Sequence, residues 1–315
     1  MKCKSLVIAL LLVGCLGCSN NSSSSEESSS SNTNDLSSST SIELTADDVE
    51  FSLMSWNIYL GKGDPKAVVQ TIKDAAPDII NFQEAKGGYD KFIEPLLQEE
   101  TQYVLVNDTV PGGAPVCSTP ILFDQNRFNY IDSGAEMLKD AYYPGVDTKS
   151  LSFVVLEDKD TEKMFFVINF HGAILKTSYE GYEHYSDEEI TNLVNEYRKG
   201  NVQQILDKFD ELKELYGDCP SIFSGDCNFD NKSIAYELSI DSGFEDAENS
   251  ALYEKNNDGL QTRHILGGKP EEGLTIDHIF ADSKVAFINH YIIRNDISYT
   301  ASDHDAVLAD IYLKS

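Results

Sequence analysis

Apolar and polar residues alternate along several short stretches of this chain, and most of these stretches end in polar side chains. In Met164–His171 (MFFVINFH), for example, an apolar run closes on Asn169 and His171. Alternation with a period of two predicts β-strands whose two faces meet different surroundings. By the same pattern we expect strands at 51–57, 78–84, 103–106, 117–123, 128–131, 151–156, 220–228, 274–280, 285–293 and 306–313.

Two stretches follow the helical period instead. Asp64-Pro65 is a helix-start signal, because Asp caps free backbone N–H groups and Pro suits the first helical position, and an apolar stripe follows up to Ala76. A longer stripe predicts a helix over 187–216. The helix between the first two strands indicates a parallel pair. Because strands outnumber helices, we expect an α/β fold of mixed sheets with helices outside, and not a strict doubly wound sheet.

The first residues have the pattern of a targeting segment. Residues 1–14 combine a basic start with an apolar run that is too short to span a bilayer, which is typical of a secretory signal peptide. The run ends in Leu-Val-Gly before Cys15, which resembles the lipobox of bacterial lipoproteins, where the cysteine carries the lipid. Cys18 is the alternative lipid site, and an ordinary signal peptide is the alternative to lipidation. We therefore expect a membrane-anchored lipoprotein outside the cytoplasm.

The segment 15–48 is rich in Ser, Asn, Asp and Glu and has very few apolar residues. Such a composition cannot bury enough surface to offset the entropy of the chain, so we expect a disordered tether between the membrane and the rest of the protein. Residues 49–315 remain, and they are long enough for one domain with a large core.

The chain is strongly acidic, with 53 acidic against 24 basic residues and a formal charge of −29. Proteins that bind duplex nucleic acid usually present a basic face, and no basic cluster appears here. The composition therefore favours other partners over nucleic acid, although a bound divalent cation can locally reverse the charge of an acidic site.

Acids, amides and histidines at the strand ends form the candidate site. They are Asn57, Glu84, His171, Asp226, Asn228, Asp277, Asp303 and His304. Burying a carboxylate at such a place costs several kcal/mol unless it is paired or bound to a metal. Several such groups together make sense around a hard cation, and oxygen donors without cysteine favour Mg²⁺, with Mn²⁺ as the alternative.

Six motifs built on these residues carry a family resemblance. In chain order they are SWNI, INFQEA, INFHG, SGDCN, TIDHIF and SDHDAV. Together they resemble the endonuclease/exonuclease/phosphatase superfamily, also called deoxyribonuclease-I-like, over residues 51–313. The resemblance implies a four-layer sandwich, in which two mixed β-sheets pack face to face with helices on the outside. It also implies hydrolysis of phosphoester bonds, usually with Mg²⁺.

The resemblance implies a role for each residue on the metal side of the site. Glu84 looks like the principal metal ligand, and Asp303 like a second metal-side carboxylate. Asn57 looks like an amide beside the metal or the phosphate. A metal held in this way would neutralise charge that builds on the phosphate during hydrolysis.

It also implies roles for the residues that handle protons and the phosphate. Asp226 and Asn228 resemble the pair that orients the attacking water and holds the phosphate. Asp277 looks like the acid that orients His304. His171 resembles the histidine that donates to a phosphate oxygen or to the leaving group.

A few positions depart from the family pattern or add to it. Phe170 and Gly172 stand where the family often has Thr and Leu, and Tyr59 stands where many of its nucleases carry an acid. These differences leave the substrate more open than the chemistry. Lys176 is a further candidate for phosphate binding, and Trp56 is expected in the core.

The remaining histidines are expected to have no part in the chemistry. His278 should face away from the site, because neighbours on a strand point to opposite sides. His184, His264 and His290 are expected at the surface or in loops, and Lys149 is expected to be an ordinary solvated charge.

Three functions compete at this point. The first is a membrane-tethered, metal-dependent phosphoesterase outside the cytoplasm, acting on a phosphoester as a monomer. The second is a secreted nuclease acting on extracellular DNA. The third is a catalytically inactive binding module, which is disfavoured because every expected catalytic position holds a suitable residue.

Overall fold

The computed structural model describes residues 43–106, 118–138, 149–174, 183–255 and 258–314. Leu44–Ser315 form a single compact unit. The predicted signal peptide, both lipidation candidates (Cys15 and Cys18) and Lys176 lie outside the described residues, as does most of the predicted tether.

The strands of the described residues form two six-stranded mixed sheets. The first sheet contains, in order across it, β11 (Val285–Ile293), β12 (Ala306–Leu313), β1 (Phe51–Asn57), β2 (Ile79–Gln83), β4 (Ile121–Asp124) and β3 (Tyr103–Val106). The second contains β5 (Phe128–Met137), β6 (Ser150–Asp158), β7 (Met164–His171), β8 (Ser221–Asp226), β10 (Asp277–Asp282) and β9 (Phe244–Asp246). The pairs β1–β2 and β7–β8 are parallel, and the other pairs are antiparallel.

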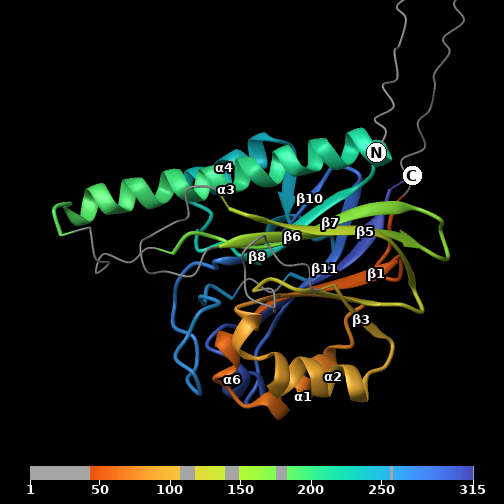
Figure 1. Ribbon diagram of the computed structural model, residues 1–315, viewed down its shortest axis with the longest axis horizontal. Coiled ribbons are helices and arrows are strands. Elements are labelled where there is room, and N and C mark those ends of the chain that lie inside the picture. Colours follow the sequence, from red (N-terminus) through yellow and green to blue (C-terminus); the bar gives the residue numbers. More distant parts are fainter. Residues whose placement is uncertain (1–42, 107–117, 139–148, 175–182, 256–257, 315) are drawn as a thin grey trace, which may run out of the picture. The chain divides into compact units, whose positions relative to one another are not determined.

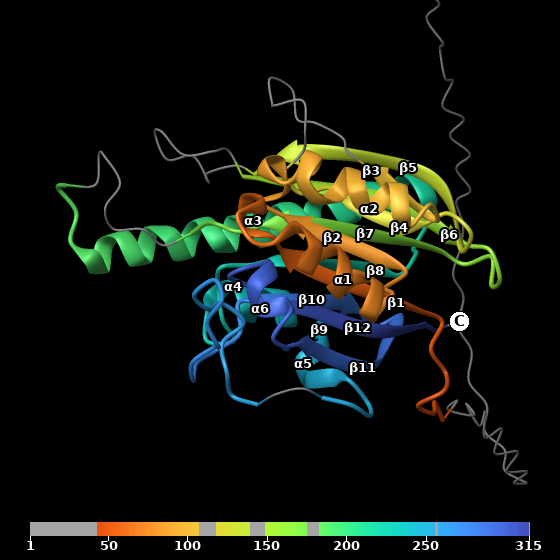
Figure 2. The same ribbon diagram turned by 90° about the horizontal axis from the view of Figure 1, so that it is seen from below.

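Helices cover the outer faces of both sheets, so the predicted four-layer sandwich is confirmed (Figures 1 and 2). The first sheet packs against α1 (Pro65–Ala75), α2 (Glu94–Glu99), α6 (Ser298–Ala301) and the π-helical η3 (Tyr89–Ile93). The second packs against α3 (Asp187–Tyr216) and α4 (Ile234–Asp241). The short α5 (Ala247–Ser250) and the 3-10 turns η1 (Tyr59–Gly61) and η2 (Ala85–Gly87) lie in connections. In the described part of the chain, every helix is too short or too polar to cross a membrane.

The start of α1 is the one that the sequence predicts. Pro65 is the first helical residue, and Asp64 accepts a hydrogen bond from the backbone N–H of Lys66 at 3.0 Å. The long helix α3 also has the predicted bounds, and Ser186 and Glu189 close its first turn with a capping box.

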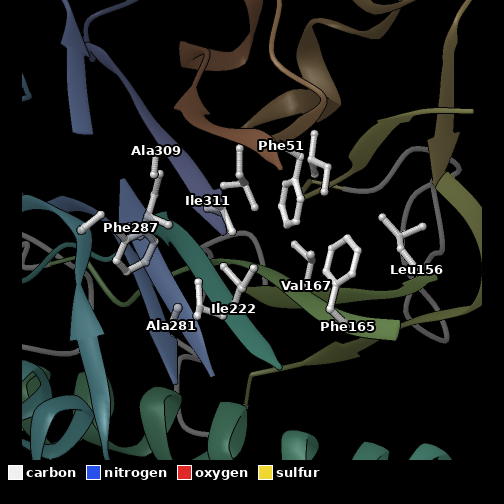
Figure 3. Packing of buried hydrophobic residues seen from close by; sticks show 14 of the residues in the cluster. Phe51, Leu156, Phe165, Val167, Ile222, Ala281, Phe287, Ala309 and Ile311 are labelled. Carbon is white, nitrogen blue, oxygen red and sulfur yellow. The ribbon is translucent and has the colours of Figure 1, made fainter. Parts of the chain in front are cut away.

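The space between the sheets is filled by apolar side chains on their inner faces (Figure 3). Phe51 of β1 and Phe165 of β7 stack across this space with ring centroids 4.8 Å apart. Both side chains are buried, as are Val167 and Ile222. Because β-strand side chains alternate, the apolar residues between these positions face outward and pack on the helices.

Toward one end of the sandwich the inner faces change from apolar to polar. In β1, the inward positions after Leu53 are Ser55 and Asn57, and in β7 they are Asn169 and His171 after Val167. These polar residues are nonetheless buried. Polar side chains in such a place must find partners among themselves.

Four of them form what we call the inter-sheet amide network: Asn81, Gln83, Asn169 and Ser224. Asn81 of β2 donates to the hydroxyl of Ser224 at 2.8 Å, and Gln83 donates to the side-chain oxygen of Asn169 at 2.9 Å. Asn169 donates in turn to the carbonyl of Phe82 at 2.7 Å. Each bond joins one sheet to the other, so the network fixes the alignment of the sheets next to the polar end.

Several strands differ from their predicted bounds, and β5 and β10 show the physical reasons. β5 continues to Met137, although the sequence predicts a strand only over 128–131. It is an edge strand with half-exposed side chains, so the alternation that marks buried strands is missing. β10 begins at Asp277 and not at 274, because the backbone N–H of Ile276 donates to the side chain of Thr262 in a loop.

Candidate active site

The carboxylate of Asp226, at the end of β8, is the centre of the polar end of the sandwich. Its Oδ2 accepts a hydrogen bond from the side-chain amide of Asn57 at 2.8 Å. The Nε2 atoms of His171 and His304 lie 3.3 and 3.8 Å from the same oxygen. Its Oδ1 accepts from the backbone N–H of Asn228 at 3.1 Å. Strand ends of both sheets therefore meet at one carboxylate, and five of the predicted site residues lie together.

His304 is held from three directions. Its Nδ1 lies 2.9 Å from Oδ2 of Asp277, so the predicted contact between these residues is confirmed. The hydroxyl of Thr262 donates to the same carboxylate oxygen at 2.6 Å. The indole N–H of Trp56 donates to the backbone carbonyl of His304 at 2.9 Å. Trp56 is a fully buried core residue, as predicted, but the sequence gives no sign of either of the last two contacts.

The two histidines at Asp226 differ in charge. Burial works against a charged His304 ring, but the Asp277 and Asp226 carboxylates outweigh it and raise the pKa of His304 to about 10. Burial also lowers the pKa of His171, and the charge of Lys149 lowers it further. At neutral pH the site therefore holds an imidazolium at His304 and a neutral ring at His171.

Asp226 stays ionised between them. Burial alone would raise the pKa of this carboxyl, but the positive charge of His304 outweighs burial, with smaller contributions from the neighbouring His171 and Lys149, and holds the pKa below its ordinary value. For Asp277, burial raises the pKa while its contact with His304 opposes the rise. Asp277 and His304 therefore titrate as one unit.

Lys149, just before β6, reaches the same site. Its Nζ lies 2.6 Å from Nε2 of His171 and donates to that atom when the ring is neutral and protonated at Nδ1. The sequence predicts only a solvated charge here, because nothing in the stretch around Lys149 shows that β6 begins beside the end of β7. The structure thus adds a cation to the predicted site.

Glu84 and Asp303 lie beside this centre and fit the hard cation that the family implies. Asp303 is 9% exposed, and its Oδ1 is buried with no hydrogen-bond partner among the described residues. Burial raises the pKa of Asp303, and the charge of Glu84 raises it further, against the opposing charge of His304. Two mutually repelling carboxylates and an unpartnered buried oxygen are a suitable donor set for a divalent cation.

The backbone helps to place Glu84. This residue follows β2 with a φ of 55°, in the left-handed region that non-glycine residues seldom adopt. Part of the hydrogen-bonding capacity of Asn57 is already used within the site. Its amide nitrogen donates to Asp226, and its oxygen accepts from the backbone N–H of Tyr59 at 3.0 Å. The side-chain oxygen keeps a second lone pair, which can face a metal or a phosphate.

A second buried group of possible metal ligands lies elsewhere among the described residues: Asp246, Glu248 and His278. His278 Nδ1 contacts Asp246 at 3.0 Å, and its Nε2 contacts the carbonyl of Phe229 at 3.1 Å. Burial disfavours a charged ring, yet the Asp246 carboxylate prevails and raises the pKa of His278 to about 9. A ring that donates from both nitrogens cannot bind a metal, so this group is a structural ion pair, and His278 faces away from the site as predicted.

The expectation of a surface or loop position is wrong for His290, whereas His264 does lie in a loop but is not exposed. Both are buried, at 8% and 2% exposure. His264 belongs to a loop, but its Nε2 lies 3.3 Å from Oδ1 of Asp305, next to His304. His290 lies on β11, where its backbone pairs with Ala309 of β12 and with Lys255. Neither contact is visible in the local sequence, since each joins distant segments.

Comparisons with known proteins identify the family. The sequence profile of the Endonuclease/Exonuclease/phosphatase family matches residues 54–304, so the chain belongs to that family. No curated protein sequence matches the chain significantly.

Solved structures share the fold at low sequence identity. An endonuclease/exonuclease/phosphatase from Bacteroides vulgatus is 20% identical with a TM-score of 0.65, covering 84% of this chain and 99% of its own. A mannosyl-6-phosphatase from Bacteroides thetaiotaomicron is 17% identical with a TM-score of 0.63, covering 84% and 100%. The human Nocturnin catalytic domain with a bound sulfate anion is 19% identical with a TM-score of 0.61, covering 84% and 94%. These likenesses establish the fold, and the substrate must be inferred from the site.

Proposed function

We propose that this chain is a metal-dependent phosphoesterase that acts outside the cytoplasm, anchored to a membrane by a lipid on Cys15 or, as the alternative, Cys18. The observation that carries the proposal is the convergence of Asn57, His171 and His304 on the ionised Asp226 carboxylate. The preferred cation is Mg²⁺, since the donors beside the centre are oxygens.

Glu84 and Asp303 would hold the cation, with the side-chain oxygen of Asn57 beside them. When bound, it would supply positive charge that neutralises the phosphoryl group. The same positive charge would relieve the repulsion between the two carboxylates. The same oxygen atoms would thus both bind the cation and hold it where it acts on the phosphoryl group.

The chain's own residues would perform the proton and charge handling. An ionised Asp226 accepts hydrogen bonds only, so it can orient a water for attack on phosphorus. The charged His304 donates from Nε2 to a phosphoryl oxygen where negative charge builds, and Asp277 fixes its ring. Lys149 lies beside His171 and adds a second positive group to the site.

The substrate class follows from charge. The net charge of −29 repels a long polyanion such as duplex DNA. A small phosphorylated molecule or a lipid headgroup contacts only the site itself, so the overall charge disfavours its binding less. A mannosyl-6-phosphatase among the structural relatives shows that this fold can act on a small sugar phosphate. We therefore place sugar phosphates and headgroup esters ahead of nucleic acids.

A substrate panel tests the proposal. The full chain is assayed with sugar phosphates, phospholipid headgroup esters, and single- and double-stranded DNA, each with Mg²⁺, Mn²⁺ or EDTA. We expect Mg²⁺-dependent hydrolysis of a small ester, lost in Asp226→Asn and kept in Asp241→Asn, which changes an exposed acid at the end of α4. Hydrolysis of DNA in preference to all small esters would indicate the nuclease, and no hydrolysis with any metal would indicate an inactive binding module.

A further inference from the structure

A separate hollow of about 330 Å³ opens in the loop that precedes β10. Arg263 and Lys269 line it together with Gln261, Ile265 and Glu271. The loop belongs to the blue segment that lies near α6 in Figures 1 and 2. A hydrogen bond from the backbone N–H of Gly267 to the carbonyl of Tyr299, 2.7 Å long, ties it to that helix. The hollow is therefore bounded by an anchored loop.

The same loop is joined directly to the catalytic segment. Arg263 pairs with His304 in an isolated antiparallel bridge. On either side of this pair, His264 N–H donates to the Asp303 carbonyl at 2.7 Å, and Asp305 N–H donates to the Thr262 carbonyl at 2.8 Å. Arg263, which lines the hollow, thus lies opposite His304.

Arg263 and Lys269 are both exposed. Among the described residues neither side chain has a hydrogen bond or an ion pair, whereas Arg127 and Arg294 each bind an aspartate. In a chain of net charge −29, acids to pair with are abundant, so two unpaired cations in one hollow are available to a ligand. Among the described residues that line the hollow, Glu271 is the one acid, and the two cations outnumber it.

We propose that this hollow is a second anion subsite, in which Arg263 and Lys269 bind a phosphate or carboxylate carried by the alcohol part of the substrate. The inference rests on the proposed function and narrows it to small esters with a second negative group. Arg263 presents a planar pair of N–H donors that suits such an anion. Gln261 and Glu271 offer hydrogen-bonding groups for hydroxyls between the two charges. Ile265, which is 82% exposed, can cover the carbon skeleton.

Glucose 1,6-bisphosphate and glucose 6-phosphate form a matched pair of probes, because they differ only in the second phosphate. The ratio of kcat/KM for the bisphosphate to that for the monophosphate is measured in the full chain. We expect Arg263→Ala to lower this ratio about tenfold or more and Lys269→Ala to lower it several-fold, since hydrogen bonds between charged groups are strong. Lys159→Ala is the control, because this exposed lysine follows β6 at the end of the sheet opposite to Lys149.

The outcomes separate the subsite from the hydrolase. If Arg263→Ala leaves the ratio unchanged, or lowers both kcat/KM values equally, the subsite proposal is overturned while the phosphoesterase stands. If the wild-type chain hydrolyses neither probe, calorimetric titration with the bisphosphate decides. Binding that Arg263→Ala weakens about tenfold and Lys159→Ala leaves intact supports the subsite even then, and equal binding or no binding overturns it.

Discussion

Nδ1 of His304 and Oδ2 of Asp277 lie 2.9 Å apart, and this buried contact joins β10 of one sheet to the segment before β12 of the other. If the two groups act as one unit, loss of either group should have the same effect on catalysis as loss of both. We expect Asp277→Asn and His304→Ala each to lower kcat by about 10²–10⁴-fold, as for loss of a general acid or base. The double mutant should be little worse than either single mutant.

The measurement is kcat for the best ester of the panel, with KM or analogue affinity measured alongside. Affinity for a non-hydrolysable analogue should change much less than kcat. If the two losses multiply in the double mutant, then Asp277 and His304 act independently, and the acid–histidine pair has no catalytic meaning.

Glu84 should govern the response to metal. Removing its charge with Glu84→Gln takes away a donor while keeping the shape of the side chain. We expect the Mg²⁺ concentration needed for half-maximal activity to rise by about a hundredfold or more, since even indirect partners of a metal contribute 10–100-fold. Glu245→Gln, at an exposed position of β9, is the control and should respond to Mg²⁺ like the wild type. An unaltered Mg²⁺ response in Glu84→Gln would remove Glu84 from the metal site.

Trp56 connects the core to the backbone of His304. In Trp56→Phe the buried carbonyl of His304 loses its donor, which should cost about 1–3 kcal/mol of unfolding free energy. Activity should fall as well, because His304 loses one of its supports. Phe82→Leu, on the neighbouring strand in the same cluster, removes volume without a hydrogen bond. It should therefore lose stability by urea denaturation but keep kcat, and an equal fall of kcat in both variants would argue against the specific role of the indole N–H.

The ion pair of His278 with Asp246 should make stability depend on pH. Because the pKa of His278 is raised to about 9 in the folded protein, the pair stabilises the fold fully below about pH 6.5 and ceases to do so as the pH rises through about 9. The change corresponds to about 3 kcal/mol. Urea unfolding between pH 6 and pH 10 should show the wild type losing its advantage over Asp246→Asn at the alkaline end. A constant difference across this range would show that His278 is neutral in the folded protein.

The lipid anchor remains a prediction from the sequence, and it has its own test. Cys15→Ser should move the protein from the membrane fraction to the soluble fraction and abolish labelling by a fatty acid, whereas Cys18→Ser should do neither. The reverse result would assign the lipid to Cys18. If both single variants and the double variant remain membrane-bound and labelled, the lipobox interpretation is wrong.

The sequence predicts the sheets and the polar ends of their strands because both depend on local patterns. The period of two places Asn57, His171 and Asp226 at strand ends, and parallel pairs bring such ends to one edge. What the sequence does not show is contact between distant segments. Thr262 lies 15 residues from Asp277, and Lys149 lies 22 residues from His171.

Burial is hard to predict for the same reason. His264 has no apolar alternation around it, yet its ring lies against Asp305, which is 41 positions further along the chain. The shape of the hollow around Arg263 also depends on how the loop is anchored to α6, and this anchor includes the backbone hydrogen bond from Gly267 to Tyr299. Backbone bonds between loops leave little trace in the side-chain pattern.

The inter-sheet amide network has a consequence for how such a protein can change. Asn81, Gln83, Asn169 and Ser224 fix the two sheets relative to each other from within, so the spacing of Asn57 and Asp226 does not rely on the surface loops. In the loop before β10, Thr262, Arg263 and His264 are bonded to the segment around His304 and must stay in place. The outer stretch after His264, which carries Lys269, can then be lengthened, shortened or replaced while the centre keeps its geometry. Exchange of this outer stretch between relatives should therefore alter the preference among substrates without rebuilding the site.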